Sequence, residues 1–99
     1  MPQANPAGLL PVSMDISVEI SFYPLMEGYE QTIIQFIKAL KKESKISVEV
    51  NGMSTQVFGD DALVMPLLHQ EMMKSLQDQK GIFVMKVGKG TLKLSKPIE

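Results

Sequence analysis

The sequence predicts an α+β fold in which four antiparallel strands form one sheet and two helices cover one of its faces. The hydrophobic period alternates between two residues, which is typical of strands, and about 3.6 residues, which is typical of helices. These changes give the order strand, helix, strand, strand, helix, strand. Right-handed crossovers convert that order into a split βαβ arrangement, the ferredoxin-like βαββαβ sandwich.

The first strand and the first helix are predicted from the residues that follow Met14. Alternation marks a strand with one core face, whose apolar members are Ile16, Val18, Ile20 and Phe22. Pro24 ends this strand, because proline has no N–H for the sheet. A helix then opens at Gly28, and its apolar stripe consists of Tyr29, Ile33, Phe36, Ile37 and Leu40.

A hairpin and a second helix are expected next. Ile46, Val48 and Val50 alternate with polar residues, and the turn signal Asn51-Gly52 leads into a third strand from Met53 to Phe58. Asp60 and Asp61 can cap a helix that runs to about Gln79, with the apolar stripe Met65, Leu68, Met72 and Leu76. Pro66 lies inside this segment, so either the first turn is irregular or the helix begins near residue 63.

The last strand, from Ile82 to Val87, has apolar residues on both faces. Ile82 and Val84 point one way, and Phe83, Met85 and Val87 point the other way. A single layer of helices covers only one face of a sheet. We therefore expect a second copy of the chain to cover the other face, in a homodimer or homotetramer that uses one of these two sets.

The chain of 99 residues is long enough for one two-layer core. Residues 1–14 are rich in proline and small residues and are expected to form a flexible N-terminal tail, although a native start near Met14 is an alternative. Residues 15–94 are expected to form the single ligand-binding domain, and residues 95–99 a C-terminal tail. Four lysines make the chain basic where it leaves the last strand, which predicts either a solvated exit or docking onto a partner chain.

Composition excludes several classes of protein. The ten basic residues are all lysines, and with eleven acidic residues they give a net charge of −1, so no nucleic-acid partner is expected. No apolar run approaches the roughly 20 residues that span a membrane, and we expect a cytoplasmic protein without membrane insertion. Cysteine is absent and His69 is the one histidine, which rules out disulfides, thiolate metal sites and sites with several histidine ligands.

No constellation of residues predicts catalysis. His69 is best explained as a surface or half-buried residue of the second helix, and Asp60 and Asp61 as a helix cap rather than a catalytic pair. The methionines are best explained as core residues rather than metal ligands. We therefore expect no enzyme activity, no catalytic cofactor and no metal.

Polar residues gather beside two of the predicted strands. Glu19 and Ser21 lie on the face of the first strand that points away from the helices, and Tyr23 lies at its end. Asn51, Ser54 and Thr55 flank the hairpin, and the first and third strands are neighbours in a split βαβ sheet, so these groups could converge. Hydroxyls, an amide and a carboxylate under an aromatic ring suit a small heteroaromatic ligand, although a solvated sheet face or a polar dimer interface has the same composition.

Two short motifs resemble the YkoF-type thiamine-binding family. The first is Val18-Glu-Ile-Ser-Phe-Tyr-Pro-Leu25, and the second is Asn51-Gly-Met-Ser-Thr-Gln-Val-Phe-Gly59 before an acidic helix start. The resemblance covers residues 16–87 and implies a ferredoxin-like fold, dimers that pack sheet to sheet and sometimes tetramers, and binding of thiamine or its hydroxymethylpyrimidine moiety without catalysis. By motif position it points to Tyr23, Pro24, Leu25, Met53, Ser54 and Thr55.

The residues and the resemblance together predict a carrier, buffer or sensor of thiamine or hydroxymethylpyrimidine. The aminopyrimidine could meet the side chains of Ser21, Asn51, Ser54 or Thr55, and the cationic thiazolium could meet the carboxylate of Glu19 or Glu49. The ring face of Tyr23 could add about 0.5–2 kcal/mol. The absence of arginine favours free thiamine over its diphosphate. The alternative is a ligand-free regulatory or interaction module that dimerises through its sheet face.

Overall fold

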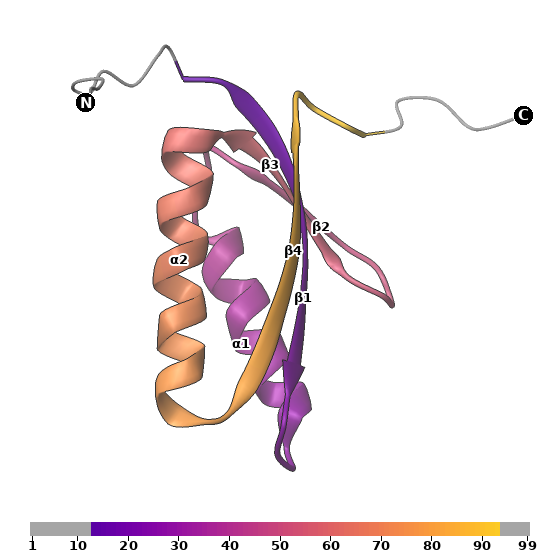
Figure 1. Ribbon diagram of the computed structural model, residues 1–99, viewed down its shortest axis with the longest axis vertical. Helices are drawn as coiled ribbons and strands as arrows, with labels where there is room; N and C mark the ends of the chain where they lie inside the picture. Colours follow the sequence, from indigo (N-terminus) through magenta and orange to yellow (C-terminus); the bar gives the residue numbers. More distant parts are fainter. Residues whose placement is uncertain (1–12, 94–99) are drawn as a thin grey trace, which may run out of the picture.

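Strand β1 (Asp15–Pro24) lies inside the sheet, and its alternating pattern sets the two faces of the domain. The computed structural model describes residues 13–93. Its strands lie in the order β2-β3-β1-β4 with every neighbouring pair antiparallel. Both helices lie on the same side of this sheet (Figure 1). The predicted α+β, ferredoxin-like βαββαβ sandwich is thereby confirmed.

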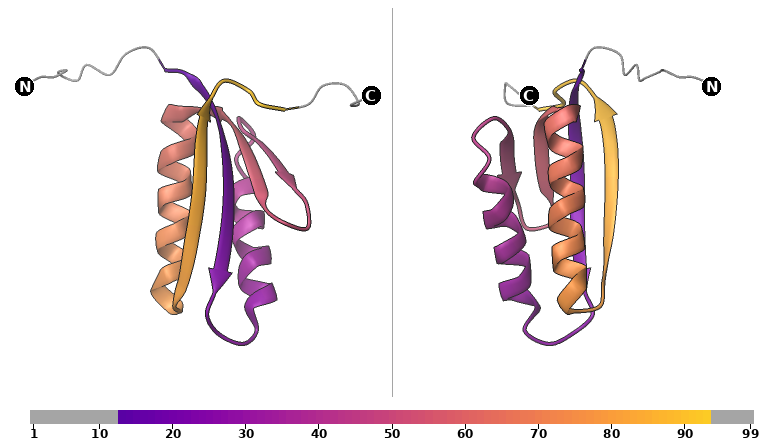
Figure 2. Two further views of the ribbon diagram at one scale, coloured as in Figure 1. Left: turned by 45° about the vertical axis from the view of Figure 1, so that its right-hand side comes forward. Right: turned by 90° about the vertical axis from the view of Figure 1, so that its left-hand side faces the viewer.

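The other elements follow the predicted order. They are α1 (Tyr29–Lys41), β2 (Ser47–Val50), β3 (Thr55–Asp60), α2 (Asp61–Asp78) and β4 (Gly81–Lys89). Figure 2 shows β1 and β4 running side by side, with the β2–β3 hairpin at the opposite edge of the sheet. Residues 1–12 of the expected N-terminal tail lie outside the described residues, as do residues 94–99, which include the whole expected C-terminal tail of residues 95–99.

The core lies between the sheet and the two helices. The apolar face of β1 is buried against α1 and α2, with Val18 and Ile20 each 1% exposed. The largest fully buried side chains are Ile20, Leu40, Leu68, Val18, Val57 and Val64. Three phenylalanines join β1, α1 and β4 in one cluster, in which the rings of Phe22 and Phe83 stack at 4.1 Å and Phe36 lies 5.1 Å from Phe83.

The pairing of β4 with β1 decides which of its two apolar sets belongs to the core. Phe83 lies opposite Phe22, and Phe83 and Met85 pack against the buried cluster. Ile82 and Val84 therefore point to the uncovered face, where they are 52% and 51% exposed. Phe83 and Met85 are therefore largely taken up by the core, whereas Val87, the third member of that set, lies opposite Val18 and is 53% exposed. The set formed by Ile82 and Val84 is the one exposed on the open face.

Helix α2 begins at Asp61, and Pro66 lies inside it. The Asp60 side chain caps the helix, because its Oδ1 accepts a hydrogen bond of 2.9 Å from the N–H of Ala62. The N–H of Asp61 donates to the carbonyl of Met14 at 2.9 Å, which ties the first turn to the start of β1. The expected start near residue 63 is therefore wrong: these bonds fix the first turn, and Pro66 removes a single N–H from an already anchored helix.

The chain crosses the open face of the sheet after β4. The Ser17 hydroxyl donates to the carbonyl of Gly90 at 2.7 Å and accepts from the N–H of Leu92 at 2.8 Å. Lys93 Nζ lies 2.9 Å from a carboxylate oxygen of Glu49 and 4.9 Å from the centre of the Phe58 ring. This part of the basic exit thus contacts the chain's own sheet, while residues 91–93 stay exposed.

Candidate functional site

A cavity of about 150 Å³ lies where the end of β1, the β2–β3 turn and helix α1 meet. We call it the hairpin cavity. Helix α1 contributes an apolar wall of Ile33, Phe36 and Ile37. Six of the seven residues predicted from the sequence line it: Ser21, Tyr23, Asn51, Met53, Ser54 and Thr55. Glu19 is the predicted residue that does not line this cavity.

The Asn51 side chain builds the turn that forms one side of the hairpin cavity. Its Oδ1 accepts hydrogen bonds from the backbone N–H groups of Met53 at 2.7 Å and Ser54 at 3.0 Å. Gly52 does not adopt a positive φ, so the turn relies on this side chain rather than on a left-handed glycine. The amide oxygen of Asn51 is therefore occupied, and its NH₂ group is what remains for a ligand.

Thr55 lies on the opposite face of the sheet from the one expected. It pairs with Ile20 across the ladder, faces the helices and is 6% exposed. Consecutive residues of a strand point to opposite faces, so Ser54 and Thr55 cannot both lie on the open face. The cavity still receives both, because it opens at the end of the sheet, where the turn brings the two faces together.

Glu19 is held by other side chains on the open face. The Ser54 hydroxyl donates to its Oε2 at 3.1 Å, and Lys86 Nζ lies 3.6 Å from its Oε1. Glu49 is likewise paired with Lys93. Neither carboxylate that was expected to meet a thiazolium lines the hairpin cavity.

Unused hydroxyls remain on the lining of the hairpin cavity. Among the hydrogen bonds within residues 13–93, none uses the hydroxyl of Ser21, Tyr23 or Thr55. Tyr23 and Met53 are 54% and 87% exposed, which places them at the mouth of the cavity. Of the three, Thr55 faces the apolar wall of α1, whereas Ser21 and Tyr23 lie on the open face of the sheet. A hydroxyl that can donate or accept beside an apolar wall suits a flat ring with polar edges.

Seven lining residues were not assigned to a site from the sequence: Ile20, Phe22, Ile33, Phe36, Ile37, Val50 and Gly52. The three residues of α1 belong to the apolar stripe of that helix, and Val50 belongs to the alternating pattern of β2. Such patterns indicate a core and carry no sign of a cavity. Part of this stripe becomes a wall for a ligand only because a gap remains between α1 and the hairpin.

Other predicted features fall outside the hairpin cavity. His69 is exposed on α2. Within residues 13–93, no group of three or more histidine, aspartate or glutamate side chains could hold a metal ion. In the same residues, no helix is both long and apolar enough to cross a membrane.

Comparison with known proteins finds likeness in structure only. No protein-family model and no curated protein matches the chain. A Streptococcus pneumoniae protein has a TM-score of 0.71 at 21% identity over 80% of this chain and 90% of its own. A hypothetical protein of Methanocaldococcus jannaschii has a TM-score of 0.68 at 22% identity, over 84% of this chain and 88% of its own.

A third solved structure connects this fold with thiamine. It is a Thermotoga maritima protein provisionally assigned to thiamine biosynthesis or salvage, with a TM-score of 0.68 at 18% identity. The likeness covers 79% of this chain and 90% of that one. At these identities the three structures show that the chain shares their small α+β fold.

Proposed function

We propose that the protein binds thiamine or its hydroxymethylpyrimidine moiety without catalysis, as a carrier, buffer or sensor of the YkoF type. The observation that carries the proposal is the hairpin cavity, which gathers six of the seven predicted residues on two strands and a turn. The thiamine-related name of the Thermotoga maritima protein with the same fold supports the choice of ligand.

The hairpin cavity suits the pyrimidine ring rather than the whole of thiamine. Its volume of about 150 Å³ lies below the roughly 300–1,000 Å³ typical of sites for drug-sized ligands. In our proposal the ring packs against Phe36, and its amino group and ring nitrogens exchange hydrogen bonds with the Thr55 hydroxyl and the NH₂ group of Asn51. The thiazolium then extends past Tyr23, whose ring face can attract a cation.

Charge on the lining favours the unphosphorylated ligand. The residues that line the hairpin cavity include no lysine, arginine, histidine or carboxylate. A diphosphate requires cations or a cradle of N–H donors, and the sequence contains no arginine to form bidentate contacts. We therefore propose free thiamine or hydroxymethylpyrimidine, with no catalytic cofactor or metal.

Thr55→Val tests the proposal by calorimetry. Valine keeps the shape of the side chain and removes one hydroxyl from the cavity wall. Because Thr55 is nearly buried and lines the cavity, affinity for hydroxymethylpyrimidine should fall five- to thirty-fold, about 1–2 kcal/mol. Circular dichroism should show an unchanged fold.

His69→Ala is the matched control, because this exposed residue of α2 does not line the hairpin cavity. Its affinity should equal that of the parent protein. If Thr55→Val binds as the parent does and His69→Ala does not, the ligand lies elsewhere. If the parent protein binds neither thiamine nor hydroxymethylpyrimidine at millimolar concentration, the binding function is wrong.

One observation favours the alternative, an interaction module that pairs with its own copy through the open face. Ile82 lies opposite Tyr23 at the sheet surface, and Tyr23, Ile82 and Val84 are each about half exposed. Large apolar side chains that neighbour one another at a surface are typical of association sites. We propose that the chain forms homodimers or homotetramers through this face, in the presence or absence of a ligand.

A further inference from the structure

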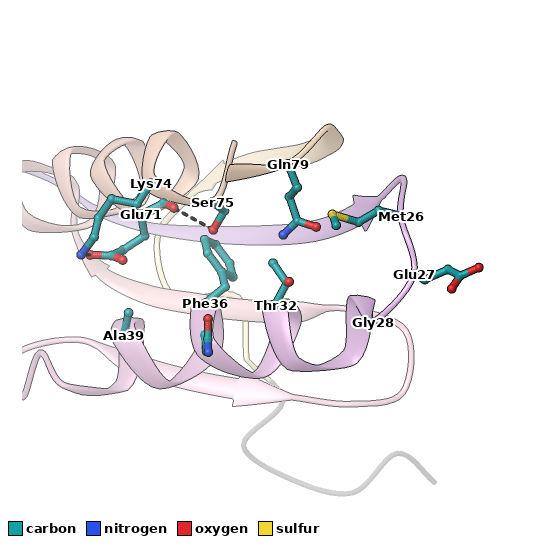
Figure 3. A pocket seen from close by; sticks show the side chains of 11 residues that line it. Met26, Glu27, Gly28, Thr32, Phe36, Ala39, Glu71, Lys74, Ser75 and Gln79 are labelled. Atoms are coloured by element: carbon teal, nitrogen blue, oxygen red, sulfur yellow. Dashed lines mark hydrogen bonds and ion pairs between the residues drawn. The ribbon is translucent and has the colours of Figure 1, made fainter. Parts of the chain in front are cut away.

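A second, larger cavity of about 470 Å³ lies between the two helices. We call it the interhelix cavity. Figure 3 shows side chains entering it from α1, from α2 and from the loop that joins β1 to α1. Its floor contains Phe36 and Ala39, and Glu71, Ser75 and Gln79 line it from α2. Except for Phe36, its lining residues differ from those of the hairpin cavity.

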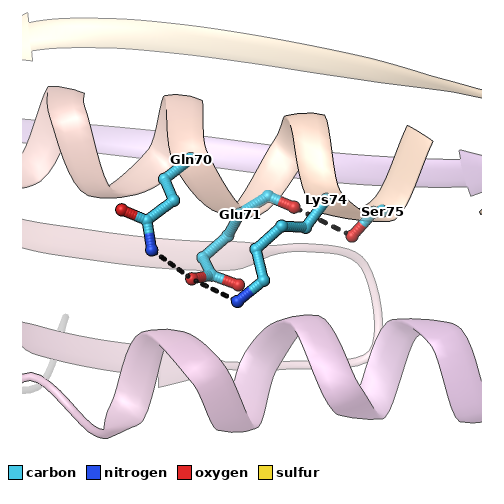
Figure 4. A network of polar contacts seen from close by, with 4 residues as sticks. All are labelled: Gln70, Glu71, Lys74 and Ser75. Carbon is cyan, nitrogen blue, oxygen red and sulfur yellow. Dashed lines mark hydrogen bonds and ion pairs between the residues drawn. The ribbon is translucent and has the colours of Figure 1, made fainter. Parts of the chain in front are cut away.

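Glu71 brings a buried carboxylate to the interhelix cavity. The residue is 8% exposed, and its side chain is directed from α2 towards α1 (Figure 4). Both polar contacts of its carboxylate use one oxygen: Oε2 lies 3.5 Å from Lys74 Nζ and 3.4 Å from Gln70 Nε2. Within residues 13–93, no hydrogen bond or ion pair uses Oε1. Oε1 is not fully buried and is therefore open to the cavity, where it can accept a hydrogen bond from another donor.

Gln79 adds a second acceptor without a partner. Its Oε1 is the only fully buried side-chain polar atom of the described residues that lacks a hydrogen bond. The side chain points from the end of α2 towards α1, across from Thr32 (Figure 3). Most buried polar groups in folded proteins are paired, so an orphaned acceptor beside a cavity indicates a missing donor.

The two acceptors lie at different ends of the same cavity. Gln79 lies eight positions after Glu71, directly beyond the last residue of α2, and eight positions correspond to roughly 12 Å along a helix axis. On the opposite wall, α1 contributes the ring of Phe36 and the methyl group of Ala39, together with the polar side chains of Thr32 and Gln35. A complementary ligand has an apolar body and a donor at each end.

Charge decides which donor belongs at Glu71. The ion pair with Lys74 is long, and the Lys74 side chain is 63% exposed, so the lysine gives little energy and can turn into solvent. A ligand ammonium can take its place while Lys74 stays hydrated. An anionic ligand would instead meet a carboxylate and an amide oxygen, neither of which can donate a hydrogen bond.

We propose that the interhelix cavity binds a small organic amine whose ammonium group meets Glu71 and whose second N–H or O–H donor, at the far end of an apolar body, meets Gln79. This site is separate from the proposed thiamine site. Tyramine has these features and is the probe for the test. Two analogues each lack one donor: phenethylamine has no hydroxyl group, and 4-ethylphenol has no ammonium group.

Titrations of the ¹⁵N-labelled full chain, followed by NMR, test the two contacts separately. Glu71→Gln keeps the size of the side chain and removes its charge, and it should weaken tyramine binding at least tenfold. Gln79→Met removes the acceptor and should weaken tyramine binding three- to tenfold. With phenethylamine the Gln79→Met variant should match the parent, and with 4-ethylphenol the Glu71→Gln variant should match the parent.

Thr55→Val in the hairpin cavity is the control and should bind tyramine as the parent does. Failure to bind tyramine at millimolar concentration would overturn the proposal, as would equal tyramine affinities for the parent, Glu71→Gln and Gln79→Met. If either variant does not fold, the affinities of the parent protein for tyramine and for its two analogues decide the question. These three affinities should differ, because tyramine makes both contacts and each analogue lacks a different one. None of these outcomes depends on thiamine binding, which is measured with Thr55→Val.

Discussion

The two faces of the sheet are held by different interactions, although strand β1 supplies both. On the helix-covered face, Val18 and Ile20 are almost fully buried. On the open face, Ser17 holds the crossing segment after β4 by hydrogen bonds, and Glu19 is paired with Lys86. Because burial of apolar area is the main stabilising term in folding, we infer that the covered face supplies most of the stability. Substitutions on the open face, or binding of a partner there, should therefore cost less folding stability than changes on the covered face.

The largest expected effect is therefore a truncation on the covered face. Leu68 of α2 is fully buried, so Leu68→Ala should lower the free energy of unfolding by about 2–5 kcal/mol. Ile82→Ala removes a comparable side chain from the open face, where it is half exposed, and should cost less than about 1 kcal/mol. Urea denaturation of both variants measures the contrast, and equal losses would contradict it.

A charge on the open face should affect association more than folding. Val84→Lys places an ammonium group at the proposed interface and should weaken self-association at least tenfold, about 1.4 kcal/mol. Light scattering at tens of micromolar should show the loss. Met73→Lys alters an equally exposed residue on α2 and should leave the mass of the parent unchanged. A parent protein with the mass of a single chain at this concentration would exclude the interface.

The crossing segment offers a more local test. Ser17→Ala removes both hydrogen bonds to residues 90 and 92, and leaves a carbonyl and an N–H without their partner. The expected loss of stability is about 1–2 kcal/mol, with faster hydrogen exchange at the Leu92 amide. Ser21→Ala, which breaks no hydrogen bond within residues 13–93, should leave exchange at Leu92 unchanged.

The smallest expected effect concerns Lys93. Its ion pair with Glu49 joins two partly exposed side chains, and its ammonium also lies over the Phe58 ring. Lys93→Met should destabilise the protein by about 0.2–1 kcal/mol, and high salt should reduce the difference, since it screens exposed charges. Lys89→Met is the control, because this exposed lysine has no ion pair within residues 13–93. A larger loss than that of Ser17→Ala would show that charge, rather than Ser17, holds the segment.

Most of the fold could be predicted because local patterns decide it. Alternation in β1 requires one buried face, and the capping residue Asp60 marks the start of α2 whatever packs around it. The start of α2 was harder to predict, because Pro66 argues against a helix locally. The backbone bond between Met14 and Asp61, which anchors the first turn, joins residues far apart in the sequence.

The candidate site could be predicted in part. The motif residues of the hairpin do line one cavity with Ser21 and Tyr23. The face on which Thr55 lies was mistaken, because the convergence of the side chains was inferred from neighbouring strands without their register. Glu19 was also assigned to the site, and its pairing with Ser54 and Lys86 depends on β1, β4 and the β2–β3 turn at once.

The sequence by itself determined the order of the elements, the buried face of β1 and the type of side chain beside the hairpin. These properties depend on residues a few positions apart, whose spacing fixes the side of a strand or helix on which they lie. Only the tertiary structure decided which polar groups are already paired and where space remains. Glu71 and Gln79 show this, because their free acceptors and the interhelix cavity exist only once α1 lies against α2. Pairing and cavities arise between elements that are distant along the chain, and no local pattern records them.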